Sequence, residues 1–169
     1  MNDDPHAFSP LSRRRLLGWL GAGAALPALA ACGGGSAEAR AFPVTYSEAE
    51  WRKRLSPLQF HVMREQGTER AGTSPLLGEH RKGMFACAAD GQPLFASTTK
   101  YDSGTGWPSF WKPLPGAIGT SSDWALGYRR TEVHCARCGS HLGHVFDDGP
   151  KPTGLRYCMN GVALSFRPG

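Results

Sequence analysis

Glycines and prolines divide the second half of this sequence into short apolar segments, and this spacing restricts the fold more than any other feature. The 169 residues include 22 glycines and 13 prolines. Frequent turns leave room only for short strands, so the chain from Gly83 onward is predicted to be antiparallel β structure. Asp90 and Gly91 suit a hairpin turn between the first two strands. The predicted strands are residues 84–87, 93–96, 117–120, 124–128, 130–135, 141–146, 156–160 and 163–166.

Two short helices are predicted ahead of the strands. Ser47 opens a capping box, and the apolar spacing that follows it predicts a helix over residues 47–54. Ser56 suits the N-cap of a second helix, with Pro57 in its first helical position. We expect Gly67 to end this second helix. The apolar faces of both helices are interpreted as packing surfaces.

The N-terminal segment has the pattern of an export signal. Residues 12–17 (SRRRLL) form a twin-arginine pattern, and residues 16–31 are uncharged and apolar. The apolar stretch is short for a membrane-spanning helix and contains glycine and proline, which favours a secretory signal. Cys32 ends the sequence LAAC, which resembles a bacterial lipobox whose cysteine would be lipidated. The alternative is an ordinary cleavage site between small residues.

Three segments of the chain follow from these features. Residues 1–31 are predicted to be the twin-arginine signal, and residues 32–44, which begin with CGGGS, a flexible tether. Residues 45–169 are long enough for one domain with its own core. We expect export by the twin-arginine route to the periplasm or cell envelope, with attachment to the membrane only through a lipid on Cys32. That compartment is oxidising.

Charge argues against one class of partner. The formal net charge of the chain is +5, and the charged residues are spread along the sequence. Because no basic block alternates with aromatic residues, we expect no nucleic-acid binding.

Four residues are spaced as two halves of a metal site. Cys135 and Cys138 form a CxxC pair followed by glycine, and Cys87 and Asp90 have the same spacing and the same trailing glycine. Zinc takes four tetrahedral ligands, commonly from two such pairs, and a carboxylate can be one of them. A structural zinc held by these four residues is therefore predicted. A disulfide between the CxxC cysteines, or three reduced thiols, are the alternatives.

Cys158 lies in a chemically suggestive stretch of the chain. Arg156 precedes it by two residues, and His141 and His144 lie upstream. A thiolate nucleophile needs a nearby cation and a proton donor for its leaving group. These residues therefore favour a catalytic thiol, although an isolated cysteine is more often a buried structural residue.

Long motifs resemble those of the B-class methionine sulfoxide reductases. The resemblance extends from about residue 47 to residue 166 and implies reduction of the R epimer of methionine sulfoxide to methionine. It also implies the family's fold, which is mainly β with two small antiparallel sheets and two short N-terminal helices. The motifs are residues 100–110 (KYDSGTGWPSF), 135–138 (CARC), 139–150 (GSHLGHVFDDGP) and 152–160 (PTGLRYCMN).

The resemblance implies roles for the site residues. Cys158 matches the nucleophile, which becomes a sulfenic acid as methionine is released. His144 is expected to donate the proton to the sulfoxide oxygen, and His141 to orient that oxygen or a water. Asn160 would position groups beside the nucleophile. The residues expected to bind substrate are Trp107, Phe146 and Arg156.

Each of these residues also has a purely structural interpretation. Trp107 taken alone is more often a core residue than a pocket wall. Arg156 is expected to stabilise the thiolate and to pair with Asp148, but Asp148 also lies in a good turn sequence, DDGP.

Three positions depart from the family pattern. Thr105 stands where many members have the cysteine that resolves the sulfenic acid, Asp90 replaces a fourth zinc cysteine, and Gly161 replaces a serine. Without a resolving cysteine, the sulfenic acid would be reduced by a small thiol or a thioredoxin-like partner. The alternatives are resolution by Cys87 or by the CxxC cysteines, if no metal holds them.

The predicted function is reduction of methionine-R-sulfoxide in exported proteins, and also of the free amino acid. A non-catalytic zinc-knuckle interaction module at the cell envelope is the alternative, which only the missing resolving cysteine supports. A disulfide-stapled surface domain is a weaker alternative, because only four cysteines follow Cys32.

Overall fold

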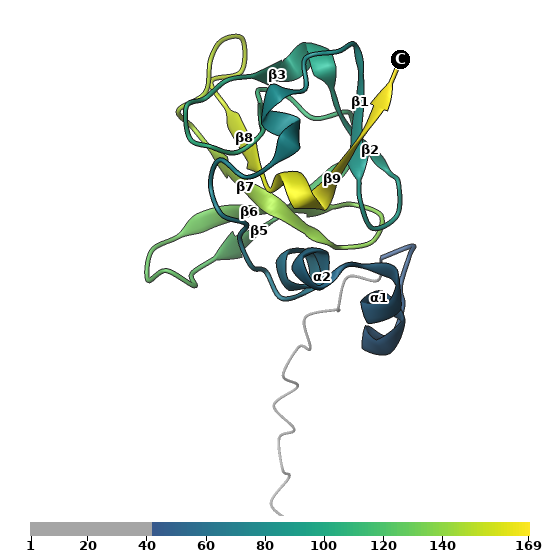
Figure 1. Ribbon diagram of the computed structural model, residues 1–169. Helices are drawn as coiled ribbons and strands as arrows, with labels where there is room; N and C mark the ends of the chain where they lie inside the picture. Colours follow the sequence, from purple (N-terminus) through teal and green to yellow (C-terminus); the bar gives the residue numbers. More distant parts are fainter. Residues whose placement is uncertain (1–41) are drawn as a thin grey trace, which may run out of the picture. The chain divides into compact units, whose positions relative to one another are not determined.

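Two antiparallel β-sheets and two short helices make up residues 42–169, the part of the chain that the computed structural model describes (Figure 1). The predicted fold class is therefore confirmed. The smaller sheet has the order β2-β1-β9, formed by β1 (Gly83–Cys87), β2 (Pro93–Ala96) and β9 (Leu164–Pro168). The larger sheet has the order β3-β4-β8-β7-β6-β5, formed by β3 (Lys100–Tyr101), β4 (Ser109–Phe110), β5 (Ile118–Asp123), β6 (Arg130–Cys135), β7 (His141–Phe146) and β8 (Arg156–Met159).

Both predicted helices are present and begin at the predicted caps. Ser47 and Glu50 form a complete capping box at the start of α1 (Glu48–Arg54). Ser56 and Gln59 form a second one at the start of α2 (Pro57–Arg64). Each cap satisfies backbone N–H groups that would otherwise have no partner, which contributes about 1 kcal/mol to helix stability. Local sequence thus fixes where both helices start.

The end of α2 differs from the prediction. The helix stops at Arg64, and Gln66 adopts the left-handed conformation (φ 56°) that was expected of Gly67. A Cβ at Gly67 would lie 2.4 Å from the ring of His61, an exposed side chain that would have to move. Three short 3-10 helices complete the fold: η1 (Pro75–Gly78), η2 (Ser97–Thr99) and η3 (Gly161–Ala163).

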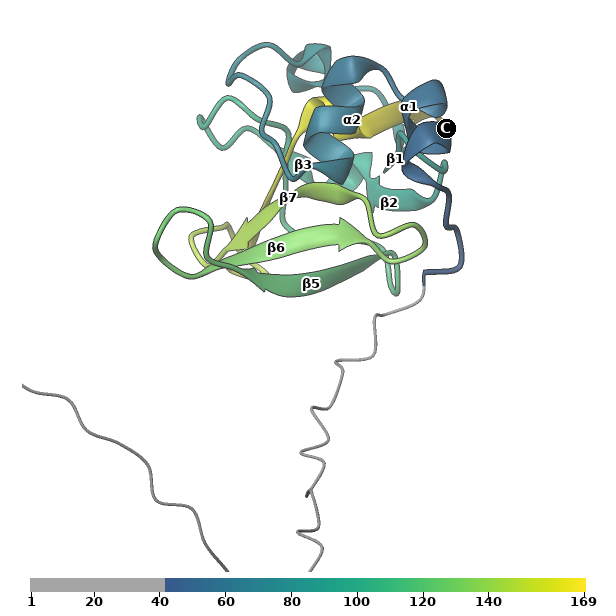
Figure 2. The same ribbon diagram turned by 90° about the horizontal axis from the view of Figure 1, so that it is seen from below.

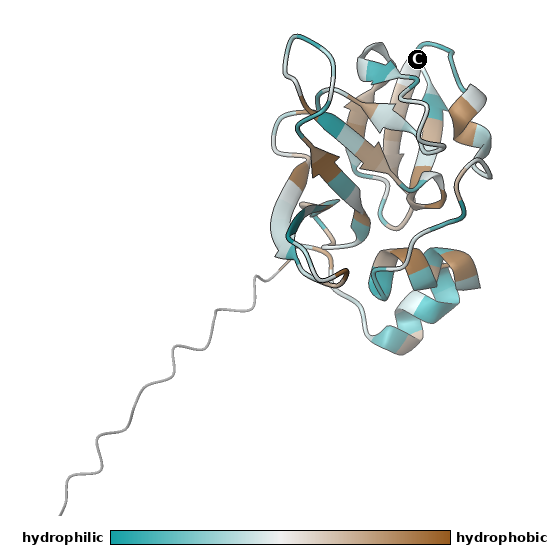
Figure 3. Cartoon of the chain, turned by 90° about the vertical axis from the view of Figure 1, so that its left-hand side faces the viewer, coloured by the Kyte–Doolittle hydropathy of each residue, from teal (hydrophilic) through white to brown (hydrophobic). Residues whose placement is uncertain are grey.

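The hydrophobic core lies between the two sheets and beneath α2. Phe95 of β2 stacks on Phe110 of β4 with ring centroids 4.3 Å apart, and Phe85 of β1 meets Phe110 edge to face at 5.0 Å. These rings are fully buried and join the small sheet to the large one. Val62 and Met63 of α2 are buried as well. Hydrophobic residues accordingly gather in the strands and on parts of the helices, while most loops are hydrophilic (Figure 3).

One predicted strand is wrong. Residues 124–128, with large apolar side chains at alternate positions, were expected to form a strand but form the turn between β5 and β6. Gly127 turns the chain with φ 78°, and its N–H donates to the carbonyl of Trp124 at 3.0 Å. No strand pairs with this segment, so its alternating side chains have nothing to pack against. The short strands β3 and β4 were not predicted.

The proposed signal segment, tether and lipidation site lie outside the described residues, apart from the last residues of the tether. The predictions for residues 1–31, for Cys32 and for the domain boundary at residue 45 are therefore untested. Among the described residues, no helix is long and apolar enough to cross a membrane.

Candidate active site

Cys158 occupies a central strand of the larger sheet. Its strand, β8, lies between β4 and β7, where Cys158 is in register with Ser109 on one side and His144 on the other. Hydrogen bonding on both edges holds this backbone firmly, which is what a nucleophile needs for accurate placement. The Cys158 side chain is half-buried and its thiol is free.

A small pocket of about 120 Å³ opens at the Cys158 thiol. Five of the residues predicted from the sequence share its wall: Cys158, His144, Asn160, Trp107 and Phe146. The structure adds Thr68, Arg130 and Gly143, which sequence analysis missed. His141 and Arg156 do not line this pocket. The pocket therefore gathers residues from β6, β7 and β8, from the loop between α2 and η1, from the loop before β4, and from the junction between β8 and η3.

Gly143 allows β7 and β8 to approach closely beside the thiol. A Cβ at this position would lie 2.1 Å from the carbonyl oxygen of Cys158. Any side chain at Gly143 would therefore push the nucleophile's own strand away.

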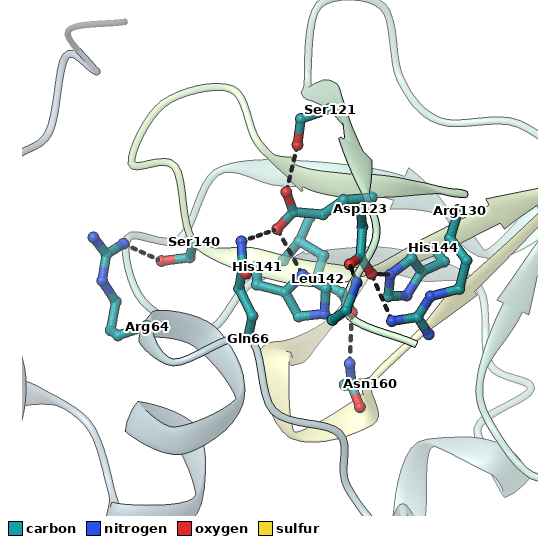
Figure 4. A network of polar contacts seen from close by, with 12 residues as sticks. Arg64, Gln66, Ser121, Asp123, Arg130, Ser140, His141, Leu142, His144 and Asn160 are labelled. Carbon is teal, nitrogen blue, oxygen red and sulfur yellow. Dashed lines mark hydrogen bonds and ion pairs between the residues drawn. The ribbon is translucent and has the colours of Figure 1, made fainter. Parts of the chain in front are cut away.

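His144 is held by a partly buried charge network that the sequence did not reveal. Its Nε2 lies 2.7 Å from Oδ2 of Asp123 on β5, and the same oxygen accepts from Arg130 at 2.5 Å (Figure 4). The N–H of Ala125 and then His144 lower the pKa of Asp123 to about 2. Since an ionised carboxylate can only accept, Nε2 of His144 carries the hydrogen and Nδ1 is its other, exchangeable nitrogen.

The pKa of His144 is lowered from its ordinary value. Burial is the main cause, because it disfavours the charged imidazolium, and Arg130 and His141 act in the same direction. The hydrogen bond to Asp123 opposes this effect and raises the pKa. Asp123 is therefore the group that preserves the capacity of His144 to hold a second proton.

His141 has its own carboxylate partner. Its Nδ1 donates to Glu132 of β6 at 2.8 Å, and Ser121 and Gln66 donate to the same carboxylate at 2.5 and 3.2 Å (Figure 4). The bond from His141 is the main reason that the pKa of Glu132 falls to about 2. Nε2 of His141 is buried and has no hydrogen-bond partner among the described residues. The rings of the two histidines lie 5.3 Å apart.

Glu69 ties together the opposite wall of the pocket. Its backbone N–H donates to Oδ1 of Asn160 at 3.0 Å, and its carbonyl accepts from Nε1 of Trp107 at 3.2 Å. The buried Glu69 carboxylate accepts from the N–H groups of Gly161 and Val162 at the start of η3. This residue therefore positions Trp107 and Asn160 at once.

Gly161, the third departure from the family pattern, is tightly surrounded. A Cβ there would lie 1.8 Å from Oγ of Ser74, so the serine side chain occupies the space that a larger residue would need. The replacement leaves no gap beside Asn160.

Arg156 supports the site from the outer side of Phe146. It donates to both oxygens of Asp148 at 2.8 Å, the pairing expected from the sequence, and stacks 4.3 Å from the centre of the Phe146 ring. The hydrogen bonds to Asp148 raise the pKa of Arg156, and the charge of Cys158 adds to this effect. The guanidinium thus lies within electrostatic reach of the thiol without lining the pocket.

Thr105 contacts the Cys158 thiol directly and is the last member of a chain of hydrogen-bonded hydroxyl groups. Its Oγ1 lies 3.8 Å from Sγ of Cys158 and 2.8 Å from Oγ of Ser103, which in turn lies 2.7 Å from Oγ of Ser109. Ser109 donates onward to the carbonyl of Trp107 at 3.1 Å. Because each hydroxyl has one hydrogen, this order directs the Thr105 hydrogen away from Cys158 and leaves Thr105 as an acceptor for the thiol.

The four predicted metal ligands come together at a second place in the fold. Cys87, Asp90, Cys135 and Cys138 each offer a ligand atom, and these atoms lie within 4.8 Å of one another. Gly91 and Gly139 make the same turn after each pair, with φ 75° and 67° and equivalent hydrogen bonds to Cys87 and Cys135.

Distances in this cluster fit a tetrahedral ion. The sulfurs of Cys87 and Cys138 are 3.8 Å apart, and Cys135 lies 3.7 Å from Oδ2 of Asp90. Zinc–sulfur bonds of about 2.3 Å give a tetrahedral edge of about 3.8 Å. Hydrogen bonds from Cys135 and Cys87 lower the pKa of Cys138, whereas contacts with the other thiols raise the pKa of Cys87 and of Cys135. The cluster is therefore able to hold a metal ion.

A half-buried thiol beside an imidazole anchored by a carboxylate defines a thiol-dependent enzyme, here on a two-sheet β fold. The SelR domain matches residues 55–168 of the chain. The chain belongs to the SelR domain family of B-class methionine sulfoxide reductases, peptide-methionine (R)-S-oxide reductases. This confirms the resemblance found in the motifs.

Individual relatives span both bacteria and a mammal. The peptide methionine sulfoxide reductase MsrB of Agrobacterium fabrum is 53% identical over 126 residues, which cover 74% of this chain and 93% of the relative. The MsrB of Thiobacillus denitrificans is 55% identical over 123 residues, 72% of this chain and 93% of the relative. The mouse mitochondrial methionine-R-sulfoxide reductase B3 is 49% identical over 126 residues, 74% of this chain and 50% of the relative.

Sequence analysis missed the residues that hold the catalytic groups in place. Asp123, Glu132 and Glu69 are isolated carboxylates in the sequence, with no motif around them. Which histidine Asp123 and Glu132 meet depends on the register of β5, β6 and β7, and the partners of Glu69 lie on distant parts of the chain, so the sequence carried no usable signal for them.

Proposed function

We propose that this enzyme reduces methionine-R-sulfoxide, protein-bound and free, through a sulfenic acid on Cys158. The observation that carries the proposal is the shared pocket, which brings the Cys158 thiol, the His144 imidazole and the Trp107 indole together. The non-catalytic interaction module has no comparable support, because the Cys158 thiol, the His144 imidazole and the Asn160 amide line one pocket.

The first half of the reaction is an oxygen transfer to the thiol. The Cys158 thiolate attacks the sulfoxide sulfur, and His144 gives a proton to the sulfoxide oxygen as the S–O bond weakens. The oxygen then moves to the Cys158 sulfur, the S–O bond of the substrate and the transient bond between the two sulfurs break, and methionine leaves. The enzyme thiol is oxidised to a sulfenic acid, and the sulfoxide is reduced by two electrons.

The remaining residues bind and orient the substrate. Trp107 and Phe146 offer apolar walls for the terminal methyl group, and Asn160 fixes the geometry beside the nucleophile. Arg156 favours the thiolate electrostatically and holds Phe146 in place. His141 lies behind His144 with an unpaired nitrogen, which suits it to orient a water rather than to touch the sulfoxide.

Regeneration of Cys158 is assigned to an external thiol. Thr105 contacts Cys158 but cannot form a disulfide. The metal cluster is too distant, because Cys158 pairs with His144 while the CxxC turn precedes His141, and three strand residues span roughly 10 Å. A small thiol or thioredoxin-like partner would attack the sulfenic acid, release water and form a mixed disulfide, which a second thiol then reduces.

Single-turnover mass spectrometry tests the proposed chemistry. The enzyme is incubated with methionine-R-sulfoxide without reductant, and dimedone is added to trap sulfenic acid. We expect one equivalent of methionine and a dimedone adduct on Cys158, whereas Cys158→Ser should show neither. An intramolecular disulfide involving Cys158 would contradict the one-cysteine cycle, and equal turnover of the S epimer with dithiothreitol would contradict the stereochemistry.

We further propose that the four-residue cluster holds a structural zinc ion. Three thiolates and a carboxylate satisfy tetrahedral zinc, although Asp90 should bind it less tightly than a fourth cysteine. Metal analysis of purified protein should find about one zinc per chain. Cys135→Ser should lose it.

Export to the cell envelope completes the proposal. The twin-arginine pattern and the lipobox-like sequence at Cys32 support an enzyme attached to the membrane by a lipid and acting on oxidised exported proteins. Cell fractionation of wild type and Cys32→Ser tests this. The variant should leave the membrane fraction and keep its specific activity.

A further inference from the structure

Exposed apolar side chains are concentrated in one turn of the described residues. Leu58, Trp124, Leu126 and Tyr128 are the large hydrophobic side chains that are exposed there, and three of them lie between β5 and β6. Trp124, Leu126 and Tyr128 are 62%, 59% and 56% exposed. We call these three residues the apolar tip. Single exposed apolar residues are ordinary, but a cluster of this kind marks an interaction surface.

The apolar tip begins directly after Asp123, the residue that holds His144. The carboxylate of Asp123, which holds His144, also accepts from the N–H of Ala125 at 2.8 Å. The turn is closed by the hydrogen bond from Gly127 to Trp124. One side chain therefore fixes both the proton donor and the start of the tip.

Tyr128 of the apolar tip lines a groove that adjoins the pocket at Cys158. Successive antiparallel strands place the β5–β6 turn and the β7–β8 loop at the same end of the sheet, as Figure 2 shows. A groove of about 370 Å³ runs between them, with Tyr128 on one side and Leu155 on the other. Arg130 and Phe146 line both this groove and the pocket at Cys158.

We propose that the apolar tip docks the apolar residues that flank methionine sulfoxide in an extended polypeptide substrate. This inference rests on the proposed function. The pocket of about 120 Å³ admits little more than the oxidised side chain, so the flanking residues of a polypeptide must cross the surface beside it. Methionines oxidised in unfolded segments have apolar neighbours that a folded protein would bury, and the tip offers them a matching surface.

Comparison of a polypeptide with a small substrate tests the inference. The triple variant Trp124→Ser, Leu126→Ser, Tyr128→Ser is assayed on methionine-oxidised unfolded casein and on N-acetyl-methionine-R-sulfoxide amide. The kcat/KM for casein should fall about tenfold, mainly through KM, because two or three apolar contacts are lost. The kcat/KM for the small substrate should stay within about twofold of wild type, since it does not reach the tip.

A matched control uses the remaining exposed apolar residue. Leu58→Ser, on α2, should leave both substrates unaffected. Equal losses on both substrates, or unchanged activity on casein, would overturn the inference. The single variant Tyr128→Ser serves if the triple variant loses activity on the small substrate, and it too must lower casein turnover selectively. If wild type fails to reduce the small substrate, the proposed function fails instead.

Other occupants of the apolar tip have distinct signatures. Dimerisation of the wild type that the triple variant abolishes would show that the tip joins two copies. Flotation of the wild-type chain with phosphatidylcholine vesicles, lost in the variant while casein turnover is kept, would show a membrane contact. Either result would contradict polypeptide docking.

Discussion

The hydroxyl group of Thr105 lies beside the Cys158 thiol, at the position where many family members have the resolving cysteine. Thr105 reaches to 3.8 Å from the thiol and ends a hydroxyl chain through Ser103 and Ser109. The site thus retains the close approach that a resolving cysteine would use but lacks the sulfur. Because of this close approach, a single substitution at residue 105 should allow a disulfide bond to Cys158.

Thr105→Cys should convert the enzyme to a two-cysteine cycle. A sulfur at this position would need to close less than about 2 Å to reach disulfide bonding distance. After one turnover without reductant, mass spectrometry should find a disulfide between residues 105 and 158 in place of the trapped sulfenic acid. Thr105→Ser keeps the hydroxyl and should still give the sulfenic acid, and a sulfenic acid that persists in the cysteine variant would contradict the geometry.

Asp123 favours the protonated form of His144. Its carboxylate raises the pKa of His144 against burial, Arg130 and His141, which lower it. If His144 is the acid, activity falls as pH rises through its pKa, and Asp123→Asn should move this fall to lower pH. A pH profile of kcat measures the shift. Asp147→Asn, which leaves the network intact, should not move it, and an unmoved profile in Asp123→Asn would exclude His144 as the proton donor.

At the level of elements, the pairing of β5, β6 and β7 assembles the acid network. Asp123 lies at the end of β5, Glu132 on β6, and both histidines on β7. No single strand carries a complete catalytic unit. The turn that joins β5 to β6 exposes the apolar tip, so one hairpin supplies both a support for catalysis and a surface.

Glu132 should make the free energy of unfolding depend on pH in the acidic range. Its pKa falls from 4.5 to about 2 in the folded chain, chiefly through His141, with contributions from Ser121 and His134. A lowered pKa means that its stabilisation is present above about pH 4.5 and is lost as pH falls towards 2. Urea unfolding over this range should show a smaller loss in Glu132→Gln. Glu48→Gln, in an exposed ion pair, should behave as wild type.

Across the whole molecule, the metal cluster joins the two sheets. Cys87 and Asp90 come from the small sheet and its turn, and the CxxC pair from the large sheet. An ion bound by both would stabilise their packing, while the catalytic pocket lies at another place. The fold therefore separates the cluster that could hold a metal ion from the pocket at Cys158.

Removal of the metal by a chelator should lower the thermal stability of the domain. Removal of zinc should reduce Tm by about 5–10 °C, which corresponds to about 1–3 kcal/mol for a domain of this size. Asp90→Cys should raise Tm and slow zinc loss, because a fourth thiolate binds zinc more tightly. Calorimetry with and without chelator measures both, and a Tm insensitive to chelator in both proteins would exclude a metal at this cluster.

Features that depend on neighbours along the chain could be predicted from the sequence alone. Both helix starts, most strands, the paired metal turns and the motif around Cys158 were predicted, because caps, turns and short motifs are local. Only the tertiary structure decided that Asp123 holds His144, that Glu132 holds His141 and that Glu69 links Trp107 to Asn160. It also decided that residues 124–128 are exposed. These depend on strand register and on which surfaces meet, which no local pattern specifies.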